Sequence, residues 1–359
     1  MNTNATPTPA PVIGAEQLEL LEKLCNACAV SGDEGEVRAI ITEQLKDAAD
    51  EMRTDALGNL LVTKRGKGEN RVRVMIAAHM DEVGFMIMED NEGGIFRFDT
   101  VGGLDVRQLV GKPVLVGKEH LPGVIGAKPI HFCKREELEQ TIPLETLKID
   151  VGPDNAGKVK VGDRATFATR FTRIGPSLRA KALDNRFGVA TLIELVKHAP
   201  DNVDLLAAFT VQEEVGLRGA RVSGFSLDPD LAIAVDSTPA NDLPAWDDSE
   251  NISYNTRLGF GPAIYVMDSS TIADPRLVKF LAATAEANGI PYQFRQPGGG
   301  GTDAGAIHRQ RAGIPSISVS VPGRYAHSAA GLARIEDWEN TLRLLQAALS
   351  QLTPAVLQR

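Results

Sequence analysis

Segments with the periodicity of amphipathic helices alternate with short apolar runs over the second half of this sequence. The predicted elements are a helix at 184–198, strands at 205–212 and 231–236, a helix at 275–288, a strand at 315–321 and a helix at 335–352. Alternation of this kind is typical of a mostly parallel sheet with helices on both faces. We therefore predict an α/β fold for this part of the chain.

The region before residue 90 has the same character. Two amphipathic helices are predicted at 16–32 and 34–51, followed by a strand pair at 52–66 and a buried strand at 72–88. We assign these elements to the same α/β domain. Residues 1–13 are rich in Pro, Thr and Asn and cannot support a core, so we predict a disordered tail there.

Between about residues 90 and 175 the pattern changes to short β runs broken by glycine and proline. Such runs are typical of a small β-rich domain. We therefore predict one α/β domain, formed by residues 14–88 and 176–359 as a mixed, mostly parallel sheet flanked by helices. A small barrel-like β-rich domain at 89–175 is inserted into it.

The composition limits the class of protein. Of the 359 residues, 43% are hydrophobic, which is enough for a full core. The net charge of −9 argues against nucleic acid or a membrane surface as a partner, because both favour a basic patch. No apolar run approaches the roughly 18 residues of a membrane span, and the first residues lack the parts of a signal peptide. We expect a cytoplasmic protein.

Acids and histidines follow the apolar strands at the points where the strands end. These residues are His79, Asp81, Glu213, Glu214, Asp236 and His327. Asp184, at the start of a predicted helix, can join them. Because the carboxyl ends of the strands in an open α/β sheet form the ligand crevice, we expect these side chains to meet there.

The residue types in this set suit a transition-metal site. Imidazole and carboxylate ligands without a thiolate favour zinc, cobalt or manganese over calcium or magnesium. A catalytic zinc usually has three protein ligands and a water, so five ligands indicate two ions roughly 3.5–4 Å apart that share one carboxylate. Taken singly, His79 can equally be an interior histidine, Asp184 a helix N-cap and Asp236 a turn residue. Convergence favours the metal site, since buried acids need cations to offset their repulsion.

Several short motifs contain these residues and occur in a fixed order. They are HMDEVGF (79–85), VIGAKP (124–129), ALDNR (182–186), QEEVGLRGA (212–220), DST (236–238), GGTDA (300–304) and RYAHS (324–328). Together they resemble the motifs of the tetrahedral and glutamyl aminopeptidases, a family of cytosolic dinuclear metallopeptidases, some of which were once labelled endoglucanases. The resemblance covers nearly the whole chain from about residue 15.

The resemblance implies a role for each candidate ligand. His79, Asp184 and Asp236 would bind one metal ion. Asp184, Glu214 and His327 would bind the other, so that Asp184 bridges the pair. The implied cofactors are two divalent ions per subunit, with Zn²⁺ as the first candidate and Co²⁺ or Mn²⁺ as the alternatives.

The resemblance also implies roles for neighbouring residues. Glu213 would be the general base, and Asp81 would hold the second N–H of the His79 ring. A cis peptide bond is expected between Asp184 and Asn185, because the bridging aspartate of the family is commonly followed by one. The two adjacent glutamates would then divide the work, one holding a metal ion and the other moving a proton.

The substrate side is less closely defined by the sequence. The family places the glycine-rich loop 297–308 beside the substrate, which makes Gly301, Thr302 and Asp303 candidate substrate-binding residues. Arg218 is a further candidate, and simple structural pairing is the alternative for Arg218 and Asp303. Family members typically dimerise through the inserted domain and assemble into a hollow dodecamer, so we expect self-association here.

Four functions are compatible with these residues to different degrees. The first is an aminopeptidase that releases N-terminal residues from peptides, and the second is a metal-dependent amide deacylase of small acylated substrates. A glycosidase is disfavoured because adjacent glutamates rarely flank a sugar bond at the roughly 5–9.5 Å that such enzymes need. A catalytically silent metal scaffold is disfavoured because it would need ligands but not the base Glu213.

Cys25 and Cys28 form a C-x-x-C motif near the N-terminus. Such a motif can be half of a zinc site or a redox pair, but no second pair at ligand spacing accompanies it. The spacing also fits one face of the predicted helix 16–32. We therefore expect both cysteines to pack within that helix.

Overall fold

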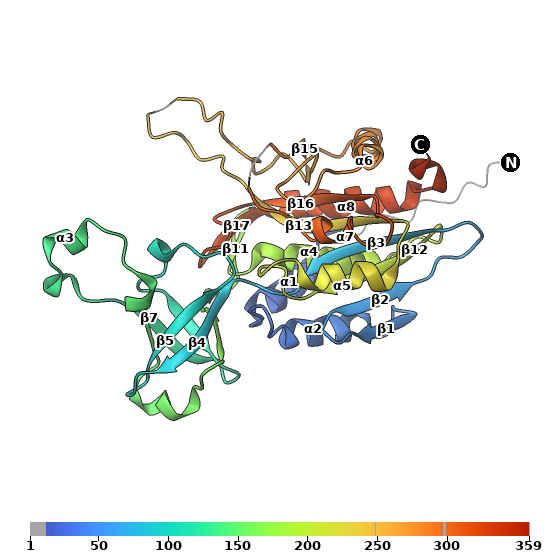
Figure 1. Ribbon diagram of the computed structural model, residues 1–359. Helices are drawn as coiled ribbons and strands as arrows, with labels where there is room; N and C mark the ends of the chain where they lie inside the picture. Colours follow the sequence, from blue (N-terminus) through green and yellow to red (C-terminus); the bar gives the residue numbers. More distant parts are fainter. Residues whose placement is uncertain (1–11, 248, 297–298, 359) are drawn as a thin grey trace.

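The computed structural model describes residues 12–247, 249–296 and 299–358. A mixed β-sheet flanked by helices forms the larger part of the molecule, and a closed β-barrel extends from one end of it (Figure 1). The predicted α/β fold with an additional barrel-like β-rich part is confirmed. Residues 1–11 of the predicted disordered tail lie outside the described residues.

The large sheet is parallel at its centre and antiparallel toward its edges. Its strands, in spatial order, are β1 (Glu51–Thr54), β2 (Leu60–Lys64), β12 (Val203–Thr210), β3 (Val72–His79), β13 (Leu231–Pro239), β16 (Ser316–Arg324), β17 (Gly331–Arg334), β11 (Ser177–Ala180) and β10 (Thr172–Ile174). Strands β12, β3, β13 and β16 are mutually parallel. The short strands β14 (Ala263–Ile264) and β15 (Gln293–Phe294) join at β16. The carboxyl ends of the four central strands therefore share one edge.

Helices cover both faces of this sheet. They are α1 (Ala15–Asn26), α2 (Gly35–Leu45), α4 (Leu183–Lys197), α6 (Pro275–Ala287) and α8 (Ile335–Gln351) on one face, and α5 (Arg218–Leu227) and α7 (Ala304–Ile307) on the other. The pleat of β3 divides its apolar side chains accordingly, with Val74 and Ile76 in the larger core and Met75 and Ala77 in the smaller. No helix among the described residues is long and apolar enough to cross a membrane.

The barrel consists of six antiparallel strands around its own apolar core. In order around the barrel they are β4 (Gly84–Asp90), β5 (Ile95–Val101), β8 (Lys148–Asp150), β7 (Leu121–Gly126), β6 (Pro113–Val116) and β9 (Arg164–Phe167). Phe85 packs edge-on against both Phe98 and Phe167, with ring centroids 5.2 Å apart in each pair. The remaining helical segments are α3 (Arg135–Leu138) and 3-10 turns at Val106–Gln108, Ile130–Phe132, Leu144–Thr146, Pro153–Lys158 and Pro354–Leu357.

Two elements near the N-terminus differ from the prediction. The strand predicted at 72–88 is two strands, because β3 ends at His79 in the sheet and β4 begins at Gly84 in the barrel. A Cβ atom at Gly84 would lie 2.5 Å from Val30 and 2.7 Å from the Ala165 carbonyl oxygen, so the crossing between the two parts of the fold is close-packed.

The two predicted N-terminal helices are also shorter than expected. Helix α1 ends at Asn26 and α2 ends at Leu45. Cys25 is fully buried in α1, as predicted, but Cys28 lies beyond the end of that helix. The prediction that both cysteines pack within one helix is therefore wrong for Cys28.

Candidate metal centre

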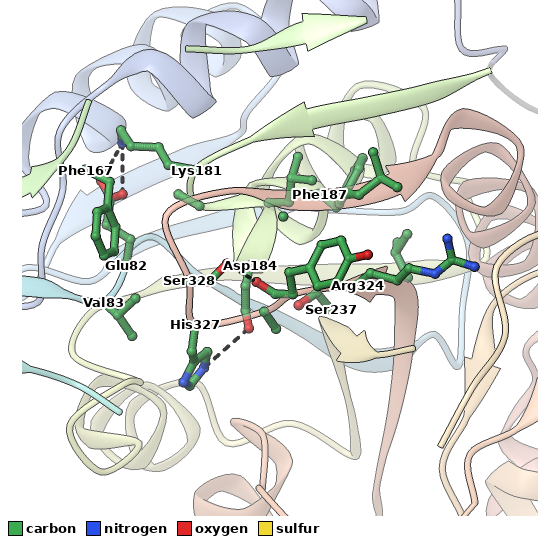
Figure 2. Close-up of a pocket in the computed structure, with 18 of the residues that line it drawn as sticks. Glu82, Val83, Phe167, Lys181, Asp184, Phe187, Ser237, Arg324, His327 and Ser328 are labelled. Atoms are coloured by element: carbon green, nitrogen blue, oxygen red, sulfur yellow. Dashed lines mark hydrogen bonds and ion pairs between the residues drawn. The ribbon is translucent and has the colours of Figure 1, made fainter. Parts of the chain in front are cut away.

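The predicted ligands converge at the carboxyl edge of the sheet. His79 is the last residue of β3, Asp236 lies in β13 beside it, and Glu214 follows β12. His327 lies in the turn after β16, and Asp184 is the second residue of α4. Figure 2 shows Asp184 at the centre of this region with His327 directed toward it. The sheet topology thus brings together residues that are up to 248 positions apart in the sequence, from His79 to His327.

The two oxygens of the Asp184 carboxylate face different histidines. Its Oδ1 atom lies 3.2 Å from His79 Nε2, and its Oδ2 atom lies 3.6 Å from His327 Nε2. On the far sides, His79 Nε2 lies 3.5 Å from an Asp236 oxygen and His327 Nε2 lies 3.3 Å from Glu214 Oε2. A carboxylate between two such groups is the arrangement that a bridging ligand requires.

Both histidines present the same ring nitrogen to this centre. The other nitrogen, Nδ1, donates to a backbone carbonyl: that of Asp81 at 3.2 Å for His79, and that of Gly103 at 2.9 Å for His327. A carbonyl partner of this kind fixes the tautomer and leaves Nε2 free to act as a ligand. Gly103 follows barrel strand β5, so the β-rich part orients a side chain of the centre, a contact that sequence reasoning missed.

Proton affinities in the centre are strongly perturbed. Burial, together with the nearby Asp184, raises the pKa of Glu214 to about 8, and burial raises that of Asp236 to about 6. Hydrogen bonding to Asp184 raises the pKa of His327 to about 9. Burial acts to lower the pKa of His79, yet its carboxylate partners raise it well above the usual value. Burial and mutual repulsion thus disfavour the charged forms of Glu214 and Asp236, and a divalent cation offsets a penalty of this kind.

His79, Asp184 and Glu214 each offer a potential ligand atom, and these atoms all lie within 4.8 Å of one another. Imidazole and carboxylate donors without sulfur suit Zn²⁺, Co²⁺ or Mn²⁺. The residues present therefore fit the metal ions that the sequence analysis implied.

Asp81 connects the histidine to the glutamate pair. It is fully buried, and its Oδ1 atom lies 3.5 Å from His79 Nδ1. The same carboxylate accepts the backbone N–H groups of Glu213 at 3.0 Å and Glu214 at 3.2 Å, as well as the Ser31 hydroxyl at 2.6 Å. Asp81 thus holds the backbone of the two adjacent glutamates in the turn that follows β12. The sequence did not indicate this role.

Replacing Asp81 by alanine is expected to lower the affinity of the centre for metal by about 10–100-fold, since the variant loses the carboxylate that accepts both glutamate N–H groups and lies 3.5 Å from His79 Nδ1. Competition with a chromophoric chelator measures this affinity. Asp154, which lies exposed on the barrel, supplies the matched control, and Asp154→Ala should bind metal as the unmodified protein does. An unchanged affinity in Asp81→Ala would show that Asp81 does not support the ligands.

The Asp184 backbone has an unusual conformation. The peptide bond between Asp184 and Asn185 is cis, as predicted, and both residues have non-helical φ/ψ angles inside α4. The Asn185 side chain donates to the Val235 carbonyl at 2.8 Å and accepts from the Gly188 N–H at 2.9 Å. The N-cap residue of α4 is Ala182, and the Asp184 carboxylate faces the two histidines, so the N-cap alternative is wrong.

A buried ion cluster lies next to the centre, where Arg186 also donates to the Asp81 carbonyl. The sequence analysis did not identify this cluster. Glu82 lies 2.8 Å from Lys181 Nζ and 3.2 Å from Arg186 Nη2, and all three side chains are buried. Figure 2 shows Glu82 and Lys181 joined in this way. Burial acts to raise the pKa of Glu82, but the two cations hold it below its usual value. The Thr166 hydroxyl of the barrel donates to Glu82 at 3.0 Å, so the cluster joins sheet, helix and barrel.

A cavity of about 610 Å³ opens beside the predicted ligands. Glu213 lines it together with Gly301, and burial followed by nearby acids such as Asp236 raises the pKa of Glu213 well above its usual value. The other candidate substrate residues lie differently. Arg218 is exposed and its guanidinium donates to the Gln212 side chain. Thr302 is buried, and its hydroxyl is hydrogen-bonded to that of Ser318. Asp303 is also buried, and one of its oxygens accepts from the Thr210 hydroxyl.

The sequence of this chain matches that of known aminopeptidases. The family model of the M42 glutamyl aminopeptidases matches residues 58–344. A putative aminopeptidase of Acetivibrio thermocellus is 38% identical over 340 residues, covering 93% of this chain and 98% of that protein. The glutamyl aminopeptidase of Lactococcus lactis is 34% identical, covering 93% and 97%. The lysyl aminopeptidase of Pyrococcus furiosus is 33% identical, covering 94% and 97%.

Solved structures give the same result. An aminopeptidase from Desulfurococcus kamchatkensis superposes with a TM-score of 0.89 at 34% identity, covering 96% of this chain and 97% of that one. The TET1 peptidase of Pyrococcus horikoshii, which can assemble into a tetrahedron or a large octahedral shell, superposes with a TM-score of 0.81 at 35% identity, covering 94% and 100%. The chain belongs to the M42 glutamyl aminopeptidase family of peptide hydrolases.

Proposed function

We propose that this chain is a two-metal aminopeptidase that removes N-terminal residues from peptides. The observation that carries the proposal is the Asp184 carboxylate, whose two oxygens face His79 and His327 separately. His79, Asp184 and Asp236 would hold one ion, and Asp184, Glu214 and His327 the other. The donor types favour Zn²⁺, with Co²⁺ or Mn²⁺ as alternatives.

Two bound ions would supply an activated water and polarise the scissile carbonyl. Glu213 then carries out the proton transfers: its carboxylate takes a proton from the attacking water and delivers it to the leaving amine. Its position supports this role, because Asp81 fixes its backbone N–H and its side chain lines the cavity. Burial and the nearby acids raise the pKa of Glu213, a direction that makes its carboxylate a stronger base.

The aminopeptidase and the amide deacylase alternative differ in their substrates, because only an aminopeptidase requires a free amino group on the residue that it releases. An aminopeptidase should hydrolyse aminoacyl p-nitroanilides that have a free amino group, and should not cleave the N-acetylated versions of the same substrates. A panel of dipeptides that differ only in the first residue would then separate acidic, basic and neutral preferences, since both a glutamyl and a lysyl aminopeptidase are among the relatives.

Removing the metal should abolish this activity. We expect hydrolysis of aminoacyl p-nitroanilides to fall to background after treatment with a chelator and to return on addition of Zn²⁺, Co²⁺ or Mn²⁺, because the activated water needs the ions. Full activity in protein shown by elemental analysis to be free of metal would refute both the aminopeptidase and the deacylase proposals.

We further propose that the chain self-associates into dimers and a dodecamer through the inserted domain predicted at 89–175, whose barrel begins at Gly84 with β4, while β10 (Thr172–Ile174) belongs to the large sheet. The barrel carries exposed apolar side chains that would be covered in such an assembly: Ile130 is 66% exposed and Phe132 is 74% exposed. A solved structure with 36% identity, PhTET1-12s, is described as a dodecamer. Sedimentation analysis would test the subunit count.

Free thiols at all three cysteines support a cytoplasmic location for the assembly.

A further inference from the structure

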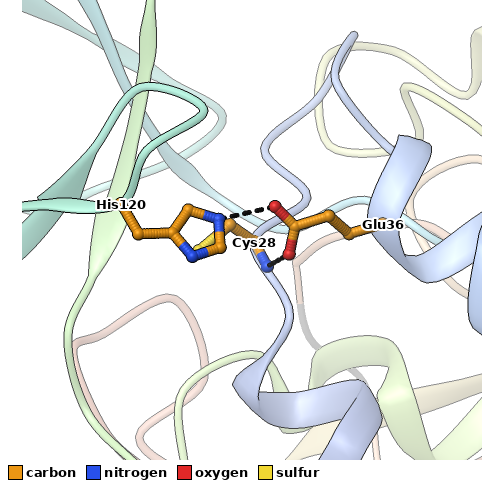
Figure 3. A group of neighbouring side chains, drawn as sticks. All are labelled: Cys28, Glu36 and His120. Atoms are coloured by element: carbon orange, nitrogen blue, oxygen red, sulfur yellow. Dashed lines mark hydrogen bonds and ion pairs between the residues drawn. The ribbon is translucent and has the colours of Figure 1, made fainter. Parts of the chain in front are cut away.

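A second group of potential metal ligands lies where the N-terminal helices meet the barrel. Cys28 follows α1, Glu36 belongs to the first turn of α2, and His120 lies in the turn between β6 and β7. Each offers one potential ligand atom, and these atoms all lie within 4.8 Å of one another. Figure 3 shows the imidazole of His120 and the thiol of Cys28 beside the Glu36 carboxylate. None of the three belongs to the predicted dinuclear centre.

Hydrogen bonds already hold this group in place. Glu36 Oε2 accepts from the Cys28 backbone N–H at 2.9 Å, and Glu36 Oε1 lies 2.6 Å from His120 Nε2. His120 has a positive φ of 51°, a conformation that non-glycine residues adopt at some cost and that occurs where a turn must present a side chain. Lys118, two residues earlier, forms an ion pair with Asp33 across the same junction. The hairpin is thus attached to the helix pair at two points.

The three donors make a set that few cations prefer. A thiolate, an imidazole and a carboxylate together suit Zn²⁺, whereas Mg²⁺ and Ca²⁺ prefer oxygen ligands only. Three protein ligands leave the fourth position of a tetrahedron for water, and the Glu36 and His120 side chains are each 36% exposed, which gives an ion access. Burial raises the pKa of Cys28 to about 11, so that a metal ion would have to displace the thiol proton on binding.

The alternative is a simple surface pair between His120 and Glu36, which would be worth at most about 1 kcal/mol. Such a pair would need no thiol. Yet the Cys28 sulfur lies within 4.8 Å of the ligand atoms of both Glu36 and His120, which are 84 positions apart in the sequence. The donor chemistry and the position at the junction favour a bound ion over the pair.

We propose that Cys28, Glu36 and His120 bind one Zn²⁺ ion per chain, separate from the dinuclear centre, and that this ion fastens the barrel to the N-terminal helices. The ion would be structural, since the site lies away from the cavity that Glu213 lines. Its binding does not depend on the proposed aminopeptidase activity.

Cobalt titration of the reduced, full-length protein tests this proposal directly. Cobalt bound by a thiolate gives a near-ultraviolet charge-transfer absorption, and the predicted dinuclear centre contains no sulfur ligand that could give one. We expect this absorption to reach the amplitude of one thiolate-bound cobalt ion per chain by the time three equivalents have been added, since the dinuclear centre takes up two of them, and to be lost in Cys28→Ser and in His120→Ala. Cys133→Ser removes another partly exposed cysteine, which lies in the segment between β7 and β8, and should keep the absorption. Peptide hydrolysis by Cys28→Ser should be unchanged.

The unmodified protein provides a second test that needs no variant. Zn²⁺ should protect Cys28 from alkylation, as measured by mass spectrometry of the labelled peptide, while Cys133 reacts at the same rate with and without the ion. Absence of the charge-transfer band on cobalt addition, survival of the band in Cys28→Ser, or alkylation of Cys28 at an unchanged rate in excess Zn²⁺ would each overturn the proposal.

Discussion

Replacing Glu213 by glutamine is expected to lower kcat for peptide hydrolysis by about 10²–10⁴-fold while both metal ions remain bound. The amide is nearly isosteric with the carboxyl group but cannot accept a proton from water. The Glu213 backbone N–H bond to Asp81 at 3.0 Å does not involve the changed atoms, so the position of the residue should be kept. Steady-state kinetics, with metal content measured on the same samples, gives both quantities.

The neighbouring glutamate provides the matched control. Glu214→Gln changes the group that lies 3.3 Å from His327 Nε2, so we expect weaker binding of one metal ion and activity that recovers partly when metal is added in excess. The two variants differ by one position in the sequence and should fail in different ways. If Glu213→Gln lost metal and Glu214→Gln lost turnover with its metal intact, the assigned roles would have to be exchanged.

Replacing Glu82 by glutamine should destabilise the protein by about 3–5 kcal/mol, because two buried cations would lose their counter-charge. Arg186 and Lys181 are 0% and 2% exposed in their side chains, so water cannot take the place of the carboxylate. Urea denaturation at fixed protein concentration measures the loss of free energy of unfolding. The Glu82→Gln variant should also bind metal less tightly, since Arg186 donates to the Asp81 carbonyl beside His79.

A surface ion pair in the barrel supplies the control for this measurement. Glu89 contacts Arg97 at 2.8 Å, but both side chains are largely exposed, so Glu89→Gln should change the free energy of unfolding by at most about 1 kcal/mol. Equal and small effects of Glu82→Gln and Glu89→Gln would show that the buried cluster contributes little to stability.

The positions of the candidate ligands could be predicted from the sequence because they follow from a repeating physical pattern. Apolar runs of about eight residues mark buried parallel strands, and polar residues that end such runs must lie at one edge of the sheet. His79 and Asp236 lie on the neighbouring strands β3 and β13, and His327 follows β16, as this rule requires. Their roles as ligands, and that of Glu213 as base, stay predictions.

Other features could not be predicted, because they depend on contacts between distant segments. Glu82 is one more polar residue after a strand, and nothing local shows that Lys181, 99 positions later, will meet it. The same holds for Gly103, whose carbonyl orients His327 across 224 positions. The edge strand β10 and its neighbour β11 are only three and four residues long, too short for a period-two pattern to be recognised.

The most direct test of the account is the number of metal ions that the centre holds. The Cys28→Ser variant, which lacks the additional site proposed above, is stripped with a chelator, titrated with Zn²⁺ in a calorimeter and analysed for bound metal. We expect two ions per chain, and we expect both to be lost when Asp184 is also replaced by alanine, because each ion would share that carboxylate. Fewer than two ions per chain, or two ions that remain bound after Asp184→Ala, would contradict a dinuclear centre bridged by Asp184.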